Sequence, residues 1–227
     1  VISSDLGVTL IFAAIFAGMF IAGGVKMWWT IGGLGVIAAA FPIAWTKFLS
    51  DEQKNRILVL IMPEVIDPTG LDERWHTTQS MNSLTGGGMT GQGLFQGHRT
   101  QTQGALFAQH TDFIFSAIGE ELGFIGCFFV VILLFLIVVR CFWVGLRSQD
   151  TLRRLVCFGV ASALIFQIIV NVGMNIGVMP VIGLTLPFIS YGASSIVSLY
   201  AMLGLVSGVF ARPAPTSHEL YIRPPIY

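Results

Sequence analysis

The residue with the clearest chemical potential is Asp112, which stands directly before an apolar run that begins at Phe113. The dipole of a helix favours a carboxylate at its N-terminus. At the mouth of a membrane span, such a carboxylate can meet a polar head group whose tail stays in the lipid. Asp112 is therefore a candidate general base, a role that requires hydrogen-bond reach to the proton it removes. The structural alternative is that Thr111 or Asp112 only caps the helix, and position alone favours this simpler role.

Other polar side chains lie inside the apolar runs, where they are energetically costly and usually face protein or water. Glu120 and Glu121 could take part in a structural ion pair or line a polar pocket, and the sequence leaves both roles open. Gln167, Asn171 and Asn175 recur every four residues, so they share one helix face that we expect to point into the bundle. Hydrogen bonding between helices is the simpler role for this stripe, and a substrate pathway is the alternative.

Two stretches of the chain are expected to depart from regular helix. Segment 179–195 contains two prolines and two glycines, which rule out one continuous helix through it. Irregular backbone at membrane depth is tolerated only beside protein or a water-filled cavity. Segment 86–97 contains six glycines, whose tight turns would let a ligand approach the backbone closely. A plain linker is the alternative for this glycine-rich segment.

The composition assigns the chain to the membrane. Hydrophobic residues make up 54% and charged residues 11%, with a mean hydropathy of +0.79, whereas about a quarter of the residues of a soluble domain are charged. A net charge of zero gives no electrostatic case for binding nucleic acid. The three cysteines and four histidines show no metal-ligand spacing, so no protein-held metal site is expected.

Five runs are long and apolar enough to cross a bilayer, which takes about 20 residues each. We therefore expect an all-α integral membrane protein, a single membrane domain over 1–227. The expected spans are 6–25, 28–45, 113–139, 155–179 and 194–210.

Basic residues indicate the orientation of these spans. Lys26, the connection 140–154 and the tail 211–227 together carry seven basic residues and two acidic ones. The positive-inside rule makes them cytoplasmic, so the long loop 46–112 is extracytoplasmic. Within that loop, residues 56–64 could form an amphipathic helix on the membrane surface. Because the chain begins outside, at Val1, without a signal sequence, we expect it to be a fragment that lacks upstream spans.

Two long motifs resemble signature segments of the RodA/FtsW/SpoVE family of peptidoglycan polymerases. They are HTDFIFSAIGEELGFIG over 110–126 and NIGVMPVIGLTLPFISYGASS over 175–195. TTQSMNSLTGGGMTGQGLFQG over 77–97 is similar to the glycine-rich external loop of the family. The resemblance runs through nearly the whole chain and implies spans six to ten of a ten-span bundle. Ala108, Gln109 and Ala193 depart from the usual pattern and leave the elongation, division or sporulation subtype open.

The resemblance implies a glycosyltransferase in the bacterial plasma membrane that polymerises lipid II, a disaccharide peptide on undecaprenyl pyrophosphate. It further implies a class B penicillin-binding protein transpeptidase as partner. The essential aspartate of the family falls on Asp112, and Arg99 or a divalent cation such as Mg²⁺ would assist departure of the pyrophosphate. No other cofactor is indicated. Candidate substrate-binding residues are Thr78, Gln79, Ser80, Arg99, His110, Thr111, Glu120, Asn171, Ser190 and Tyr191.

Two competing functions belong to other classes of protein. A lipid II transporter, or flippase, would use Glu120 and the stripe of Gln167, Asn171 and Asn175 as a polar path. It would need polar groups at mid-membrane on several spans, and the first, second and fifth expected spans offer almost none. A non-catalytic scaffold for the transpeptidase would tolerate replacement of Asp112.

Overall fold

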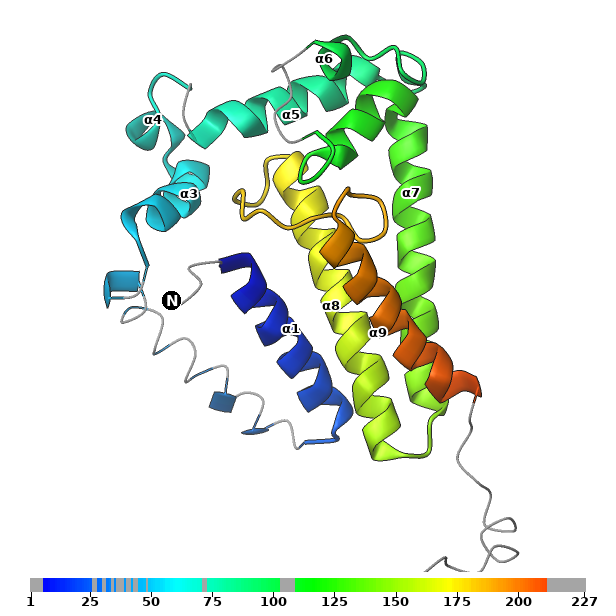
Figure 1. Ribbon diagram of the computed structural model, residues 1–227. Coiled ribbons are helices and arrows are strands. Elements are labelled where there is room, and N and C mark those ends of the chain that lie inside the picture. Colours follow the sequence, from blue (N-terminus) through cyan, green and yellow to red (C-terminus); the bar gives the residue numbers. More distant parts are fainter. Residues whose placement is uncertain are drawn as a thin grey trace, which may run out of the picture.

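The regular secondary structure of the described residues is all helical, which confirms the expected all-α membrane fold (Figure 1). The computed structural model describes residues 6–25, 49–70, 73–102 and 109–211, with isolated positions between 28 and 47. The expected span 28–45 and the expected tail beyond Ala211 lie outside the described residues. The helices are α1 Leu6–Ala22, α3 Asp51–Ile61, α4 Pro63–Ile66, α5 Glu73–Gly87, α6 His98–Gln101, α7 Ile114–Arg147, α8 Thr151–Asn175 and α9 Ala193–Ala211.

Helix α8 is the centre of the bundle. It packs against α1, α7 and α9, and 50% of its most apolar window is buried, against 22% in α7 and 11% in α9. These three are the described helices long and apolar enough to cross a membrane, and α1 is a shorter apolar helix. Small residues allow the close approach of α1 and α8, because a Cβ at Gly18 would overlap the side chain of Ser162. The exposed outer faces of α7 and α9 are therefore free for lipid or for other protein.

Helix α7 is divided by a sharp kink at Gly123, where φ is 69° and ψ is −168°. The sequence led us to expect one uninterrupted span over 113–139. Instead, a short arm over 114–122 lies beside α5, and the long arm over 124–147 then runs along α8 (Figure 1). The long arm also continues past Val139 to Arg147, because Phe142, Trp143 and Val144 still offer apolar surface for packing. The connection to α8 is consequently much shorter than the expected segment 140–154.

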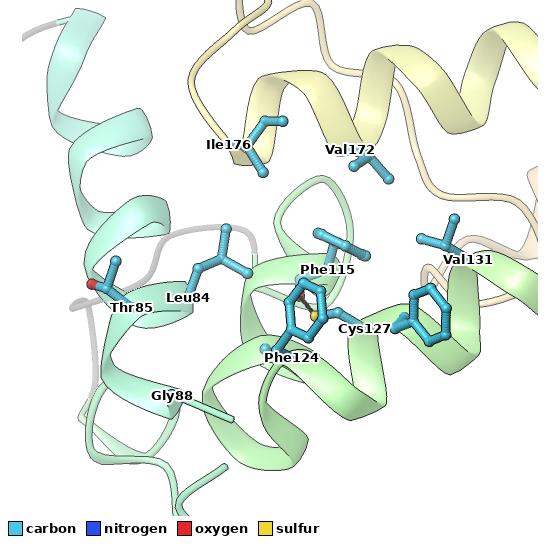
Figure 2. A pocket seen from close by; sticks show the side chains of 11 residues that line it. Leu84, Thr85, Gly88, Phe115, Phe124, Cys127, Val131, Val172 and Ile176 are labelled. Carbon is cyan, nitrogen blue, oxygen red and sulfur yellow. Dashed lines mark hydrogen bonds between the residues drawn. The ribbon is translucent and has the colours of Figure 1, made fainter. Parts of the chain in front are cut away.

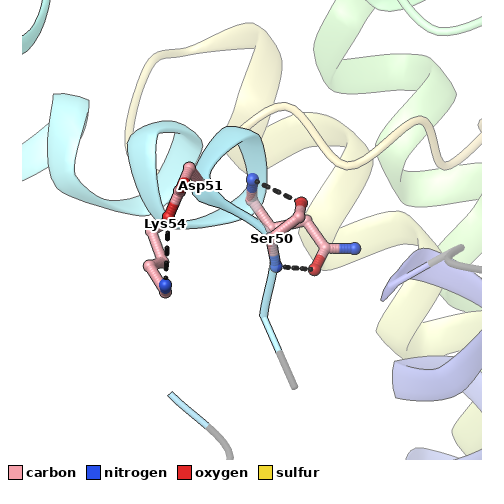
Figure 3. Close-up of polar contacts among 4 residues, drawn as sticks. Ser50, Asp51 and Lys54 are labelled. Carbon is pink, nitrogen blue, oxygen red and sulfur yellow. Dashed lines mark hydrogen bonds and ion pairs between the residues drawn. The ribbon is translucent and has the colours of Figure 1, made fainter. Parts of the chain in front are cut away.

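The described part of the loop 46–112 contains four helices, α3 to α6. Helix α3 starts earlier than the amphipathic helix expected over 56–64, because Ser50 and Gln53 form a capping box at its N-terminus (Figure 3). Lys54 also pairs with Asp51 at 3.1 Å. At the start of α5, the buried carboxylate of Asp67 accepts hydrogen bonds from backbone N–H groups. These local caps explain why so long a connection keeps a defined shape. The position of α3 on a membrane surface stays a prediction.

Candidate functional site

The segment that leads into α7 is anchored through its backbone to the irregular chain after α8. The N–H of Tyr191 donates to the carbonyl of His110 at 2.7 Å. The hydroxyl of Ser190 donates to the carbonyl of Thr111 at 2.6 Å and accepts from the N–H of Leu186 at 2.8 Å. The proline- and glycine-containing segment 179–195 is thus packed beside protein, as its irregular backbone requires.

The next carbonyl along the chain, that of Asp112, is held by two buried amides of α8. The side-chain nitrogen of Asn171 lies 2.9 Å from it, and that of Asn175 lies 3.1 Å away. Asn171 also donates to the carbonyl of Leu184 at 2.7 Å. Both asparagines are fully buried, so the expectation that this stripe points into the bundle is correct for them. Their amide hydrogens are taken by the protein, which makes them groups that position the site.

Two serines extend this buried network to α5, within the loop 46–112. The side-chain oxygen of Asn175 accepts from the hydroxyl of Ser116 at 2.6 Å. The hydroxyl of Ser80, on α5, donates to the backbone carbonyl of Asn175 at 2.9 Å and also contacts the hydroxyl of Ser116. Both serines are fully buried. Helix α5 is therefore joined by hydrogen bonds to α7 and α8 close to Asp112.

The carboxylate of Asp112 stands apart from this network. It is half-buried, and it has no hydrogen-bond or ion-pair partner among the described residues. Phe113 is the N-cap residue of α7 and makes no side-chain cap, so the simpler expectation that Asp112 caps the helix is wrong. Gly183 lies opposite, where a Cβ would be 3.9 Å from Oδ2 of Asp112. Desolvation by burial raises the pKa of Asp112 above its ordinary value. A free carboxylate with raised basicity suits proton abstraction.

The two adjacent glutamates hold the loop that carries Arg99. Glu120 is fully buried and accepts from the backbone N–H of Arg99 at 2.6 Å, and Glu121 accepts from the N–H of Phe95 at 3.1 Å. Neither forms an ion pair within the described ranges. The guanidinium of Arg99 donates to the side-chain oxygen of Gln79. The carboxylates bind backbone N–H groups and the Thr100 hydroxyl of the same chain, so the described residues show no ion pair, and the polar-pocket role stays a prediction.

The glycine-rich segment docks on the kink of α7. A Cβ at Gly87 or Gly91 would overlap backbone atoms of the short arm, and Gly91 and Gly123 both have a positive φ. The N–H of Gln92 donates to the carbonyl of Glu120 at 2.9 Å. These glycines thus allow a close approach, but the approaching group is protein backbone. Sequence reasoning missed this partner, and the glycines at 119 and 123 were the available signal.

The remaining candidate residues differ in their access to solvent. Tyr191 is 77% exposed, and Thr78 and His110 are also exposed, so these three are free to contact a ligand. Two residues near the site, Gly183 and Ser116, were not among the candidates predicted from the sequence. For Gly183, the prolines and glycines of segment 179–195 had marked an irregular backbone. The half-buried candidates are Gln79, Arg99 and Thr111, and the buried ones are Ser80, Glu120, Asn171 and Ser190.

The donor set does not fit a protein-held divalent cation. Within the described residues, no three metal-ligating side chains gather at one place. Glu120 and Glu121 each accept a hydrogen bond from the loop, whereas the Asp112 carboxylate has no partner among the described residues. A hydrated Mg²⁺ needs near-octahedral oxygen coordination. No step proposed below uses a metal.

An apolar groove of about 510 Å³ adjoins the short arm of α7 (Figure 2). Leu84 of α5, Phe115 and Phe124 of the two arms, and Val172 and Ile176 near the end of α8 line it. No charged side chain belongs to this lining. Because a sugar or a pyrophosphate would lose its hydration there without compensation, polar chemistry belongs on the side of Asp112.

Comparison with known sequences shows consistent matches along the chain. A family model described as cell cycle protein, FTSW_RODA_SPOVE, matches residues 1–212. Peptidoglycan glycosyltransferase MrdB of Escherichia coli is 35% identical over 207 residues, covering 90% of this chain and 54% of MrdB. The probable peptidoglycan glycosyltransferase FtsW of Trichlorobacter lovleyi is 36% identical over 213 residues, with coverages of 92% and 54%. The chain thus spans about half the length of the curated relatives it matches.

Two solved structures share the fold. A chain from a structure described as "Structural coordination of polymerization and crosslinking by a peptidoglycan synthase complex" aligns with a TM-score of 0.69. It is 34% identical, and the match covers 89% of this chain and 54% of that one. A crystal structure of a mutant of the rod shape determining protein RodA from Thermus thermophilus aligns with a TM-score of 0.51 at 27% identity. That match covers 91% of this chain and 66% of that one.

Proposed function

The chain belongs to the FtsW/RodA/SpoVE family of cell cycle proteins, and from this membership we propose that the whole protein is a peptidoglycan glycosyltransferase that polymerises lipid II. The relatives named as peptidoglycan glycosyltransferases support this activity. The observation that carries the proposal is the carboxylate of Asp112, which is half-buried and unpartnered in the described chain while its backbone is held in place.

In the proposed reaction, Asp112 is the general base. It removes the proton from the acceptor hydroxyl, and the resulting oxygen attacks the anomeric carbon of the donor glycan. The bond from that carbon to the pyrophosphate breaks with inversion, and undecaprenyl pyrophosphate leaves. Hydrogen bonds from Asn171 and Asn175 to the carbonyl of Asp112 hold the backbone from which its side chain extends, which favours a productive geometry.

Arg99 is the proposed cation for the leaving pyrophosphate. A guanidinium near the departing group would stabilise the charge that develops in the transition state. Glu120 holds the backbone of Arg99, and Gln79 accepts from its side chain. Thr78, His110 and Tyr191 are the exposed candidates for contacts with the sugar or peptide of the substrate.

The competing functions have less support. A flippase would need the α8 stripe as a polar path, but Asn171 and Asn175 donate to backbone carbonyls of the protein. A scaffold gives no reason for a free, partly desolvated carboxylate at Asp112. The similar structure described as a peptidoglycan synthase complex supports a penicillin-binding protein transpeptidase as partner. The positions of the arginines support a bacterial plasma membrane protein with a cytoplasmic C-terminus.

The test uses the full-length protein, purified with its transpeptidase partner and supplied with labelled lipid II. Asp112→Asn removes the base but preserves shape, and Asp150→Asn is the matched control at the other end of the bundle. We expect Asp112→Asn to slow glycan formation by about 10²–10⁴-fold, the usual contribution of a positioned base. Glycan synthesis by Asp112→Asn at the rate of the control would refute the role of Asp112. Absence of synthesis by the unmodified complex, with lipid II transport present, would favour the flippase.

A further inference from the structure

A cluster of arginines and aromatic rings lies near the C-terminal end of α7, whereas Asp112 precedes the N-terminus of the same helix. The guanidinium of Arg140 lies 4.4 Å from the ring centre of Trp143 and 4.7 Å from that of Phe210 on α9. The guanidinium of Arg147 lies 3.9 Å from the ring centre of Trp143. Cation–π contacts of this kind restrict where a guanidinium can go without neutralising its charge.

Among the described residues, no acidic side chain compensates the positive charge of this cluster. Asp150 is the sole acidic residue between 122 and 211, and it pairs with Arg153 at 3.5 Å. Arg140 and Arg147 are exposed and form no ion pair with a described carboxylate. The guanidinium groups of Arg140 and Arg147 are therefore available to bind an anion from outside the described chain.

An apolar groove begins at the same cluster. It has a volume of about 740 Å³ and runs between α7 and α9, with Arg140 and Phe210 among its lining residues. Leu133 and Ile137 line it from α7, and Leu203 lines it from α9. The outer faces of these two helices are the least buried of the candidate spans. The groove thus joins a basic end to an apolar length.

We propose that this groove binds an anionic phospholipid, with the lipid phosphate on Arg140 and Arg147 and one acyl chain between α7 and α9. Arginine pairs with phosphate through a planar fork of N–H donors, and the aromatic rings hold the fork of each arginine in place. Basic pockets between transmembrane helices are known to accept anionic head groups. This inference is independent of the proposed glycosyltransferase activity.

Charge argues for a lipid over a transmembrane helix of another protein. A helix seated in the groove would cover Arg140 and would have to supply a carboxylate at that depth, because a buried, unpaired cation is costly. A phospholipid brings its phosphate and its apolar chain in the same relative order as the arginines and the groove. The orientation expected from the arginines would place this lipid in the cytoplasmic leaflet.

Native mass spectrometry of the full-length protein would measure the binding of dioleoyl phosphatidylglycerol against dioleoyl phosphatidylcholine. We expect Arg140→Gln and Arg147→Gln each to weaken phosphatidylglycerol binding about fivefold, which corresponds to about 1 kcal/mol per arginine. Arg153→Gln is the matched control, since Arg153 is already paired with Asp150. This variant should bind phosphatidylglycerol with the affinity of the unmodified protein. Equal effects of the three substitutions would overturn the site, because binding would then follow overall charge.

A second pair of variants tests the groove without altering any charge. Ser207 lines the groove and Ser198 does not, although both are exposed on α9. Ser207→Phe should reduce the number of retained phosphatidylglycerol molecules by one, whereas Ser198→Phe should retain all of them. Unchanged retention in Ser207→Phe would overturn the proposal. So would a disulfide between Ser207→Cys and a cysteine placed in the transmembrane helix of the partner, since that result would show a protein in the groove.

Discussion

Replacing Asn171 with alanine tests whether the buried amides of α8 position the candidate base. In the native protein, Asn171 donates to the carbonyls of Asp112 and Leu184 at 2.9 and 2.7 Å. The substitution leaves the carbonyl of Asp112 with Asn175 as its remaining donor. The carbonyl of Leu184 loses the one side-chain donor observed for it, inside a region that water does not reach. Leu184 follows Gly183, which lies opposite the Asp112 carboxylate. The substitution therefore weakens the backbone of Asp112 and also the backbone segment that faces its carboxylate.

The expected magnitude follows from these two bonds. Hydrogen bonds between helices within membranes contribute about 0.6 kcal/mol on average and up to about 1.7 kcal/mol, so Asn171→Ala should destabilise the protein by about 1–3 kcal/mol. The loss of activity should exceed the loss of folded protein, since a shift of about 1 Å at a reacting group can slow a reaction about 10²-fold. A substitution that acted only through stability would lower activity in proportion to the folded fraction.

Two measurements separate these outcomes. Unfolding of the full-length protein in mixed detergent gives the change in the free energy of unfolding, and labelled lipid II gives the rate at a temperature where both proteins are folded. Ser198→Ala is the control, because Ser198 is exposed and bonds only within its own helix turn. Full activity in Asn171→Ala, in a protein where Asp112→Asn is inactive, would refute the positioning role.

Two further predictions concern the glycine loop and the titration of Asp112. Gly91→Ala should destabilise the protein by about 1–3 kcal/mol. The reason is that φ of Gly91 is 81° and a Cβ there would overlap the carbonyl of Glu121. Gly204→Ala is the control in the same unfolding assay, because nothing lies within 4 Å of a Cβ at Gly204. Because burial raises the pKa of Asp112, folding favours its protonated form, and stability falls as pH rises through that pKa while the reaction rate increases. Asp112→Asn should therefore flatten the pH–rate profile and be at least as stable as the native protein at neutral pH, and a native profile in this variant would contradict the assignment.

Much of the fold was predictable because it depends on composition and spacing. A chain with 11% charged residues and long apolar runs has to place those runs in lipid as helices. The four-residue spacing of Asn171 and Asn175 likewise indicated that both point into the bundle, and they are fully buried there. The start of α7 at Ile114, two residues after Asp112, followed from the change from polar to apolar residues.

Other features were not predictable because they depend on contacts between distant segments. Glycines at 87 and 91 showed where the backbone could be approached, but not that the kink of α7 would approach it. Glu120 and Glu121 were recognised as costly charges, but their partners are backbone N–H groups of a loop about twenty residues earlier in the chain. The kink at Gly123 depends on that docked loop, since a lone glycine within an apolar run does not by itself end a helix.

The sequence by itself determined the membrane class, the main apolar helices and the placement of a carboxylate at the mouth of a span, because each of these follows from local polarity and period. Only the tertiary structure decided that the Asp112 side chain has no partner among the described residues while its backbone carbonyl is held by hydrogen bonds. The donors to this stretch of backbone come from Ser190, Tyr191 and two asparagines of α8, all about 60–80 residues away along the chain. The order of residues along the chain does not show which of them lie close together in the fold. Folding brings these groups together because buried carbonyls at membrane depth must find hydrogen-bond donors.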